Sequence, residues 1–191
     1  MERQPRRGLD AIADVTARDR VLIAARHGGT GMDEAPDKVA ALVDTARVLD
    51  ALPARYALIG GVAVGIHSGV PRATADTDIA VHSQIDREAV SHALVAAGFR
   101  RVGAFRHRLN FRHASGEPIQ LVFDAAFDPM IERAEHLDVA GVRVPIVRKP
   151  DLIELKSRAG ADPARRRSKA LQDQADVELL RGDAPDPDEG W

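Results

Sequence analysis

Hydrophobic residues recur along the chain at two spacings, and the two spacings predict different elements. Between residues 37 and 53 apolar side chains recur every three to four positions, which predicts a helix. Residues 56–59 form a continuous apolar run of strand length. Residues 77–81 alternate, and a strand with this alternation places Asp76 and Asp78 together on the face opposite its apolar side chains.

The hydrophobic pattern of the other residues predicts further helices and strands around residues 56–81. Further helices are expected at 62–67, 86–97, from 128, at 151–159 and from 162–163 to about 181. Further strands are expected at 108–112 and 118–124, and a hairpin at 139–146. The pattern indicates an α+β fold, a small mixed sheet of about five strands flanked by helices, with a C-terminal helical pair.

The chain divides into parts of different character. We expect an N-terminal arm that is partly disordered, a main domain, two C-terminal helices packed on that domain, and a flexible tail rich in Asp and Pro; their ranges are 1–36, 37–150, 151–181 and 182–191. Within the arm, Leu9, Ile12 and Val15 indicate one face of a helix.

Composition narrows the available chemistry. The 191 residues include no cysteine, which excludes disulfides, thiolate metal sites and cysteine nucleophiles. Basic and acidic residues number 27 and 29, so the net charge of −2 gives no overall attraction to nucleic acid or anionic lipid. The longest apolar run, residues 56–66, is far shorter than a membrane helix, and we expect a cytoplasmic protein with no membrane contact.

One stretch combines residue types suited to phosphate chemistry. Gly60 and Gly61 follow a predicted strand and open a short helix, where bare backbone N–H groups can approach a phosphate. Asp76 and Asp78, two positions apart on a strand, lie about 7 Å apart along the backbone and can hold Mg²⁺. Arg72 adds a forked donor for phosphate oxygens. This combination is typical of phosphoryl chemistry on a metal-bound nucleotide.

This stretch resembles the signature of minimal nucleotidyltransferases of the DNA polymerase β superfamily, and within it the AbiEii-like group of bacterial toxin–antitoxin systems. The resemblance spans about residues 37 to 181, and the segments that carry it are 60–63, 67–69, 72–78, 150–156, Lys169 and 173–180. It implies a polymerase β-type fold and transfer of a nucleoside monophosphate from a Mg²⁺-bound NTP to an acceptor hydroxyl. The acceptor would be RNA, tRNA or a protein, and a cognate toxin or antitoxin partner is implied as well.

The resemblance also assigns roles to residues. Gly60, Gly61, Arg72, Thr74 and Lys156 would bind the nucleotide. Asp76 and Asp78 would be catalytic and bind the metal.

A third carboxylate is normal on a neighbouring strand of this family, and its position falls on Gln120, which cannot act as a base. Asp124 shares the strand parity of Gln120 and is the candidate third acid, although the intervening rise is about 13 Å.

Several features keep alternative interpretations open. Gln120 is compatible with a nucleotide-binding regulatory module that has lost catalysis, and the motif also fits small-molecule nucleotidyltransferases of the antibiotic-modifying kind. The basic cluster of 165–167, with Arg158 and Lys169, is either an RNA contact or a solvated helix face. His67 and His82 are either proton-transfer groups or polar contacts near the sheet edge.

Overall fold

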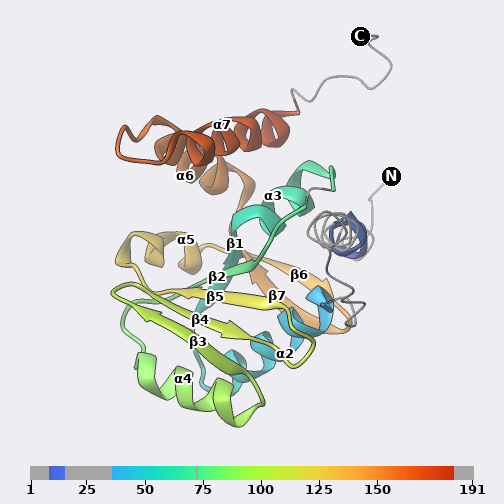
Figure 1. The fold of residues 1–191 in the computed structure, drawn as a ribbon, viewed down its shortest axis with the longest axis vertical. Helices are drawn as coiled ribbons and strands as arrows, with labels where there is room; N and C mark the ends of the chain where they lie inside the picture. Colours follow the sequence, from blue (N-terminus) through green and yellow to red (C-terminus); the bar gives the residue numbers. More distant parts are fainter. Residues whose placement is uncertain (1–8, 16–35, 72, 183–191) are drawn as a thin grey trace, which may run out of the picture.

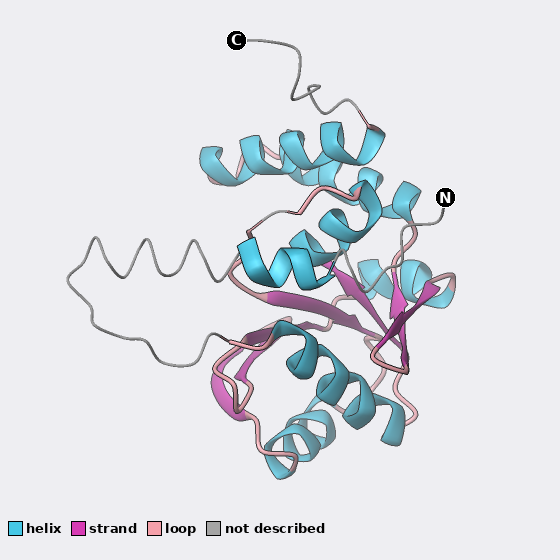
Figure 2. Ribbon diagram, turned by 90° about the vertical axis from the view of Figure 1, so that its right-hand side faces the viewer, coloured by secondary structure: helices cyan, strands magenta, loops and turns pink. Residues whose placement is uncertain are grey.

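The computed structural model of the protein describes residues 9–15, 36–71 and 73–182 (Figure 1). Arg72, most of the N-terminal arm and the tail after residue 182 lie outside the described residues. Within these ranges the molecule is a mixed sheet covered by helices on both sides, as Figure 2 shows.

The sheet has seven strands within the described residues, where the sequence predicted about five. Their order across the sheet is β3-β4-β5-β2-β1-β7-β6. The strands are β1 (Tyr56–Ile59), β2 (Thr77–Val81), β3 (Arg100–Phe105), β4 (Arg108–Arg112), β5 (Pro118–Val122), β6 (Glu135–Val139) and β7 (Val142–Ile146). β2 runs parallel to β5 and β1 parallel to β7, while the other neighbours are antiparallel.

Helices lie on both faces of the sheet. They are α2 (Lys38–Ala51), α3 (Gly60–Ser68), α4 (Arg87–Ala96), α5 (Asp128–Glu132), α6 (Lys149–Ala161) and α7 (Arg167–Arg181), with a short 3-10 helix η1 (Ala125–Phe127). α2 packs on β7 and α4 packs on β3, below the sheet in Figure 1. α3 packs on β1 and β2, and the antiparallel pair of α6 and α7 contacts α3 at the other end of the molecule.

Local sequence signals account for most helix ends. The side chain of Asp37 caps α2 by accepting a hydrogen bond from the N–H of Ala40. Asp86 caps α4 in the same way, by accepting hydrogen bonds from the N–H groups of Glu88 and Ala89. Gly69 ends α3 and Gly182 ends α7 in the left-handed conformation that glycine adopts at little cost.

The observed fold differs from the prediction at two elements, β3 and the start of α7. The edge strand β3 was not predicted, because nearly all of its side chains are exposed and it lacks the buried alternation that marks a strand. The last helix begins at Arg167 rather than at 162–163. The side chain of Asp162 accepts a hydrogen bond from Ala164, which forms a turn through Pro163 before the helix starts.

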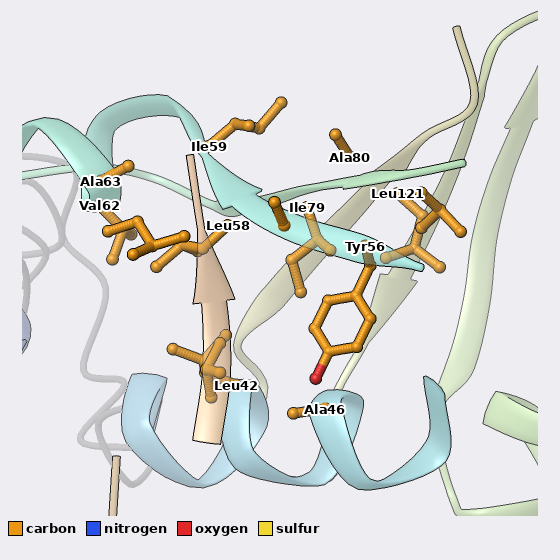
Figure 3. Packing of buried hydrophobic residues seen from close by; sticks show 14 of the residues in the cluster. Leu42, Ala46, Tyr56, Leu58, Ile59, Val62, Ala63, Ile79, Ala80 and Leu121 are labelled. Carbon is orange, nitrogen blue, oxygen red and sulfur yellow. The ribbon is translucent and has the colours of Figure 1, made fainter. Parts of the chain in front are cut away.

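The core lies between the sheet and its helices. In Figure 3, Leu42 and Ala46 of α2 face Tyr56, Leu58 and Ile79 of the central strands, all buried.

The described part of the N-terminal arm joins this packing. Residues 9–15 are helical, and Leu9 and Ile12 are buried, in agreement with the predicted helix face. A Cβ added at Gly65 of α3 would lie 2.5 Å from Cδ1 of Ile12, so the close approach depends on the glycine. No helix in the described ranges is long and apolar enough to cross a membrane.

Candidate functional site

The fold brings Asp76 and Asp78 to the start of β2, a central strand of the sheet. Asp76 lies just before β2 and Asp78 is its second residue. Asp78 lies opposite Gln120 in the parallel register with β5 and opposite Ile59 in the antiparallel register with β1. The hydroxyl of Thr74 donates a hydrogen bond to the backbone oxygen of Asp76, at 3.2 Å. The predicted acidic pair is therefore held on one face of the central strands.

Gly60 lets the start of α3 approach Asp78 closely. Its φ is +70°, and a Cβ built at this position would lie 2.1 Å from Oδ2 of Asp78. A larger residue would therefore clash with the carboxylate and would be strained in its own backbone. α3 begins at Gly60, and its capping residue Ile59 supplies no side-chain hydrogen bond. The first turn of α3 thus presents the positive end of a helix beside the acidic pair.

Opposing influences act on the ionisation of Asp78. Burial is the largest, and with the negative charge of Asp76 it raises the pKa of Asp78 to about 7. The positive charges of Lys156, Arg108 and Lys169 act in the opposite direction. These cations come from α6, β4 and α7, so three distant parts of the chain place positive charge around one carboxylate.

Gln120 occupies the side of the site where the resemblance expected a third acid. Its Nε2 donates a hydrogen bond to Oδ2 of Asp76, and its Oε1 accepts one from Arg108, at 3.3 Å. Within the described ranges, no group of three or more His, Asp or Glu side chains could hold a metal ion. The arrangement provides two carboxylates, one neutral amide and one guanidinium.

Asp124 is engaged elsewhere in the structure. It follows β5 and caps η1, where its Oδ1 accepts a hydrogen bond from the N–H of Ala126 at 3.0 Å. Its side chain makes a local contact, whereas Gln120 contacts Asp76 directly. The role of Asp124 as third acid stays a prediction.

Lys156 lies between the two C-terminal helices. Its Nζ is 2.8 Å from Oδ1 of Asp173 and 2.8 Å from Oδ2 of Asp176, and both carboxylates are buried. Arg165 also pairs with Asp173, at 2.5 Å. Lys156 therefore joins α6 to α7 while its charge reaches Asp78. Sequence reasoning missed this double contact, although the spacing of Asp173 and Asp176, three residues apart on one helix, was a usable signal.

The two histidines have separate environments. Nε2 of His67, in α3, lies 2.7 Å from the backbone oxygen of Val147, just after β7. His82 follows β2 at its far end, and its Nε2 is 3.8 Å from Asp128 and 3.9 Å from Glu132. Both make the polar contacts that were one of the two sequence interpretations.

Comparison with known proteins supports the fold. No protein-family model matches the chain, and no curated protein sequence is similar to it. Among solved structures, an antigenic nucleotidyltransferase-like protein from Paracoccidioides brasiliensis is 24% identical, with 75% of each chain covered and a TM-score of 0.53. The lincosamide antibiotic adenylyltransferase LnuA, lincomycin-bound, is 17% identical, with 71% of this chain and 90% of that chain covered and a TM-score of 0.50.

A third similar structure is ANT(2'')-Ia in complex with adenylyl-2''-tobramycin. It is 14% identical, with 76% of this chain and 90% of that chain covered and a TM-score of 0.52. At these identities the likeness shows the fold alone, which is that of nucleotidyltransferase-like proteins.

Proposed function

We propose that this protein transfers a nucleoside monophosphate from a Mg²⁺-bound NTP to an acceptor hydroxyl and releases pyrophosphate. The observation that carries the proposal is the convergence, at the end of the central strands, of two carboxylates, the N-terminal end of α3 and three cations. Phosphoryl transfer needs this set, because catalysis rests on positioning and on neutralising phosphate charge.

The residues present fit a hard divalent cation. Asp76 and Asp78 offer carboxylate oxygens, which Mg²⁺ prefers, and burial together with the charge of Asp76 disfavours ionisation of Asp78, which a bound cation would favour. We assign Mg²⁺ to these two residues. When bound, the ion would supply charge neutralisation for the nucleotide phosphates.

The other residues have roles that follow from their placement. The first turn of α3, at Gly60 and Gly61, offers backbone N–H groups to phosphate oxygens. Lys156 adds positive charge from α6. Thr74 fixes the backbone next to Asp76. Arg72 keeps its predicted phosphate contact as part of the same proposal.

In the proposed reaction the acceptor oxygen forms a bond to the α-phosphorus, and the bond from that phosphorus to the bridging oxygen breaks. Pyrophosphate leaves with the electron pair of the broken bond. Gln120 cannot take the proton of the acceptor hydroxyl, since an amide is not a base at neutral pH. That proton passes to the carboxylate of Asp76, to which Gln120 donates, or to water.

A second candidate function is nucleotide binding without transfer. It is favoured by the contact of Gln120 with Asp76 and Arg108, which satisfies the amide on both sides without a third acid. A binding module of this kind would be stabilised by NTP and would release no pyrophosphate with any acceptor.

The biological context and the identity of the acceptor belong to the same proposal. A toxin–antitoxin role, with a cognate toxin or antitoxin partner, rests on the sequence resemblance alone. Small-molecule acceptors are suggested by the antibiotic-modifying proteins of similar fold, and RNA, tRNA or protein acceptors by the resemblance.

The proposal is tested by label transfer from α-³²P-NTP with Mg²⁺ and a panel of RNA, protein and small-molecule acceptors. Asp76→Asn and Asp78→Asn should each abolish transfer, because each removes a charge that holds the ion. Asp138→Asn, at an exposed position of β6 on the opposite side of the sheet order from β5, is the matched control and should transfer like the wild type. Unchanged transfer by the Asp76 and Asp78 variants would overturn the proposal.

A further inference from the structure

The hairpin of β3 and β4 is the most one-sidedly charged segment of the described chain. Residues 99–116 contain five arginines and two histidines and no acidic residue. Arg101 is paired with Glu88 of α4, on the helix-covered side of the sheet. The guanidinium groups of Arg100 and Arg106 are exposed and form no ion pair with any described residue. The positive charge of this hairpin is therefore largely uncompensated.

The strand register places part of this charge on the face that carries Asp78. Asp78 pairs with Gln120, Gln120 with Asn110, and Arg100 with Arg112 across β3 and β4. Paired residues share a face and alternate residues return to it, so Arg108, Arg112 and Arg100 continue the face of Asp78 toward the sheet edge. Oδ1 of Asn110 on this face is buried and has no hydrogen-bond partner among the described residues.

An exposed aromatic ring lies on the same face. Phe105 is 54% exposed, and the guanidinium carbon of Arg108 is 4.8 Å from its ring centroid. Gly103 permits this position, because a Cβ there would lie 3.0 Å from the ring of Phe105. An exposed phenyl ring with an arginine against one face is a combination on which unpaired bases stack while phosphates bind nearby.

We propose that the open face of β3 and β4 binds a single-stranded nucleic acid and leads it to the acidic pair. Phe105 would stack on a base, and Arg100, Arg106 and Arg112 would contact phosphates. The inference deepens the proposed function, since it identifies the acceptor of that same site. Charge complementarity favours this occupant: a strand with one phosphate per nucleotide is attracted by the hairpin, and a polycationic small molecule is repelled.

The basic cluster of residues 165–167 with Arg158 and Lys169, on the C-terminal helices, is less suited to binding a nucleic acid. Arg165 is engaged with buried Asp173, and Arg158 pairs with Glu154 on its own helix, so part of that charge is neutralised. The cluster thus serves as the internal control for the hairpin.

The test measures fluorescence anisotropy of labelled 12-nucleotide oligouridine and oligothymidine with the full chain. Arg100→Gln/Arg106→Gln should weaken binding about tenfold, and Phe105→Ala about fivefold or more through lost stacking. Arg166→Gln/Arg167→Gln removes the same charge from the other cluster and should bind within about twofold of wild type. Thermal melting of each variant checks that it is folded. Wild-type affinity should fall steeply with salt.

Wild-type binding by both hairpin variants, an equal loss in the Arg166/Arg167 variant, or no binding of either oligonucleotide at low salt would overturn the inference. If the hairpin variants lose binding while no acceptor is ever labelled, the proposed transfer fails and the nucleic-acid surface stands.

Discussion

Asp78 is the residue at which the main features of the candidate site meet. It lies against Gly60, beside Asp76 and within the field of three cations. Its raised pKa of about 7 records that burial and Asp76 outweigh those cations when no metal ion is bound. Ionisation of Asp78 in the folded protein therefore costs free energy, and a bound cation would lower that cost.

The raised pKa of Asp78 predicts that the free energy of unfolding depends on pH. The ordinary pKa of an Asp side chain in an unfolded chain is about 3.8, while the pKa of folded Asp78 is about 7. The folded state binds more protons in this window, so the contribution of Asp78 to stability falls as pH rises from about 4 to about 7 and is constant above. In metal-free buffer, Asp78→Asn should gain stability relative to wild type across that window, by up to about 4 kcal/mol.

Urea unfolding at pH 4.5 and pH 8 measures this difference. Groups that do not interact with Asp78 titrate alike in both proteins and cancel in the comparison, whereas Asp76, whose charge acts on Asp78, contributes to the measured difference. Asp138→Asn, at an exposed position of β6, serves as the control and should show a nearly constant offset. An offset between Asp78→Asn and wild type that does not change with pH would contradict the assignment.

Among elements, the pair of α6 and α7 depends on charge as well as on apolar packing. Asp173 and Asp176 are buried in the face of α7 that meets α6, and Lys156 pairs with both. A buried carboxylate without its cation is costly, because the charge has left water without compensation. The pair also delivers Lys156 and Lys169 toward Asp78, so stability and the field of the site are linked through the same helices.

Replacing Lys156 should therefore cost stability as well as activity. We expect Lys156→Met to lower the free energy of unfolding by about 3 kcal/mol, since two buried carboxylates lose a partner. Lys169→Gln changes an exposed side chain of the same pair of helices and should cost less than about 0.5 kcal/mol. Chemical denaturation measures both, and equal stabilities for the two variants would contradict the structural role of Lys156.

Across the whole molecule, a buried ion pair connects parts of the chain that are far apart in sequence. Lys38 at the start of α2 pairs with Glu117 just before β5, and each side chain is only 1% exposed. The same carboxylate accepts a hydrogen bond from Thr77 of β2 at 3.2 Å. These contacts fix α2, β2 and β5 relative to one another on the side of the sheet opposite Asp78.

We expect Lys38→Met to lower the free energy of unfolding by about 3 kcal/mol or more, because the buried charge of Glu117 loses its cationic partner. Adding Glu117→Gln removes that charge and keeps an acceptor for Thr77, so the double variant should recover part of the loss. Thermal and urea unfolding of the single and double variants measure the recovery. A double variant less stable than Lys38→Met would contradict this account.

Much of the local structure could be predicted from the sequence. Spacing of apolar residues and capping side chains act over a few neighbouring residues, and they determine the helix that begins at Lys38 and the strands Tyr56–Ile59 and Thr77–Val81. The cap of α4 at Asp86 is local in the same sense. The two-residue period of a strand also predicted that Asp76 and Asp78 lie together, although the structure places Asp76 in the bend just before β2.

Contacts between distant segments were decided only by the tertiary structure. Strand pairing placed Gln120, rather than Asp124, against Asp76, and strand order placed β3 at an edge where an exposed strand can form. The partners of Lys156 and the three cations around Asp78 likewise come from different elements. The physical reason is that burial and electrostatic fields depend on which elements meet in space, whereas periodicity reports only the local backbone.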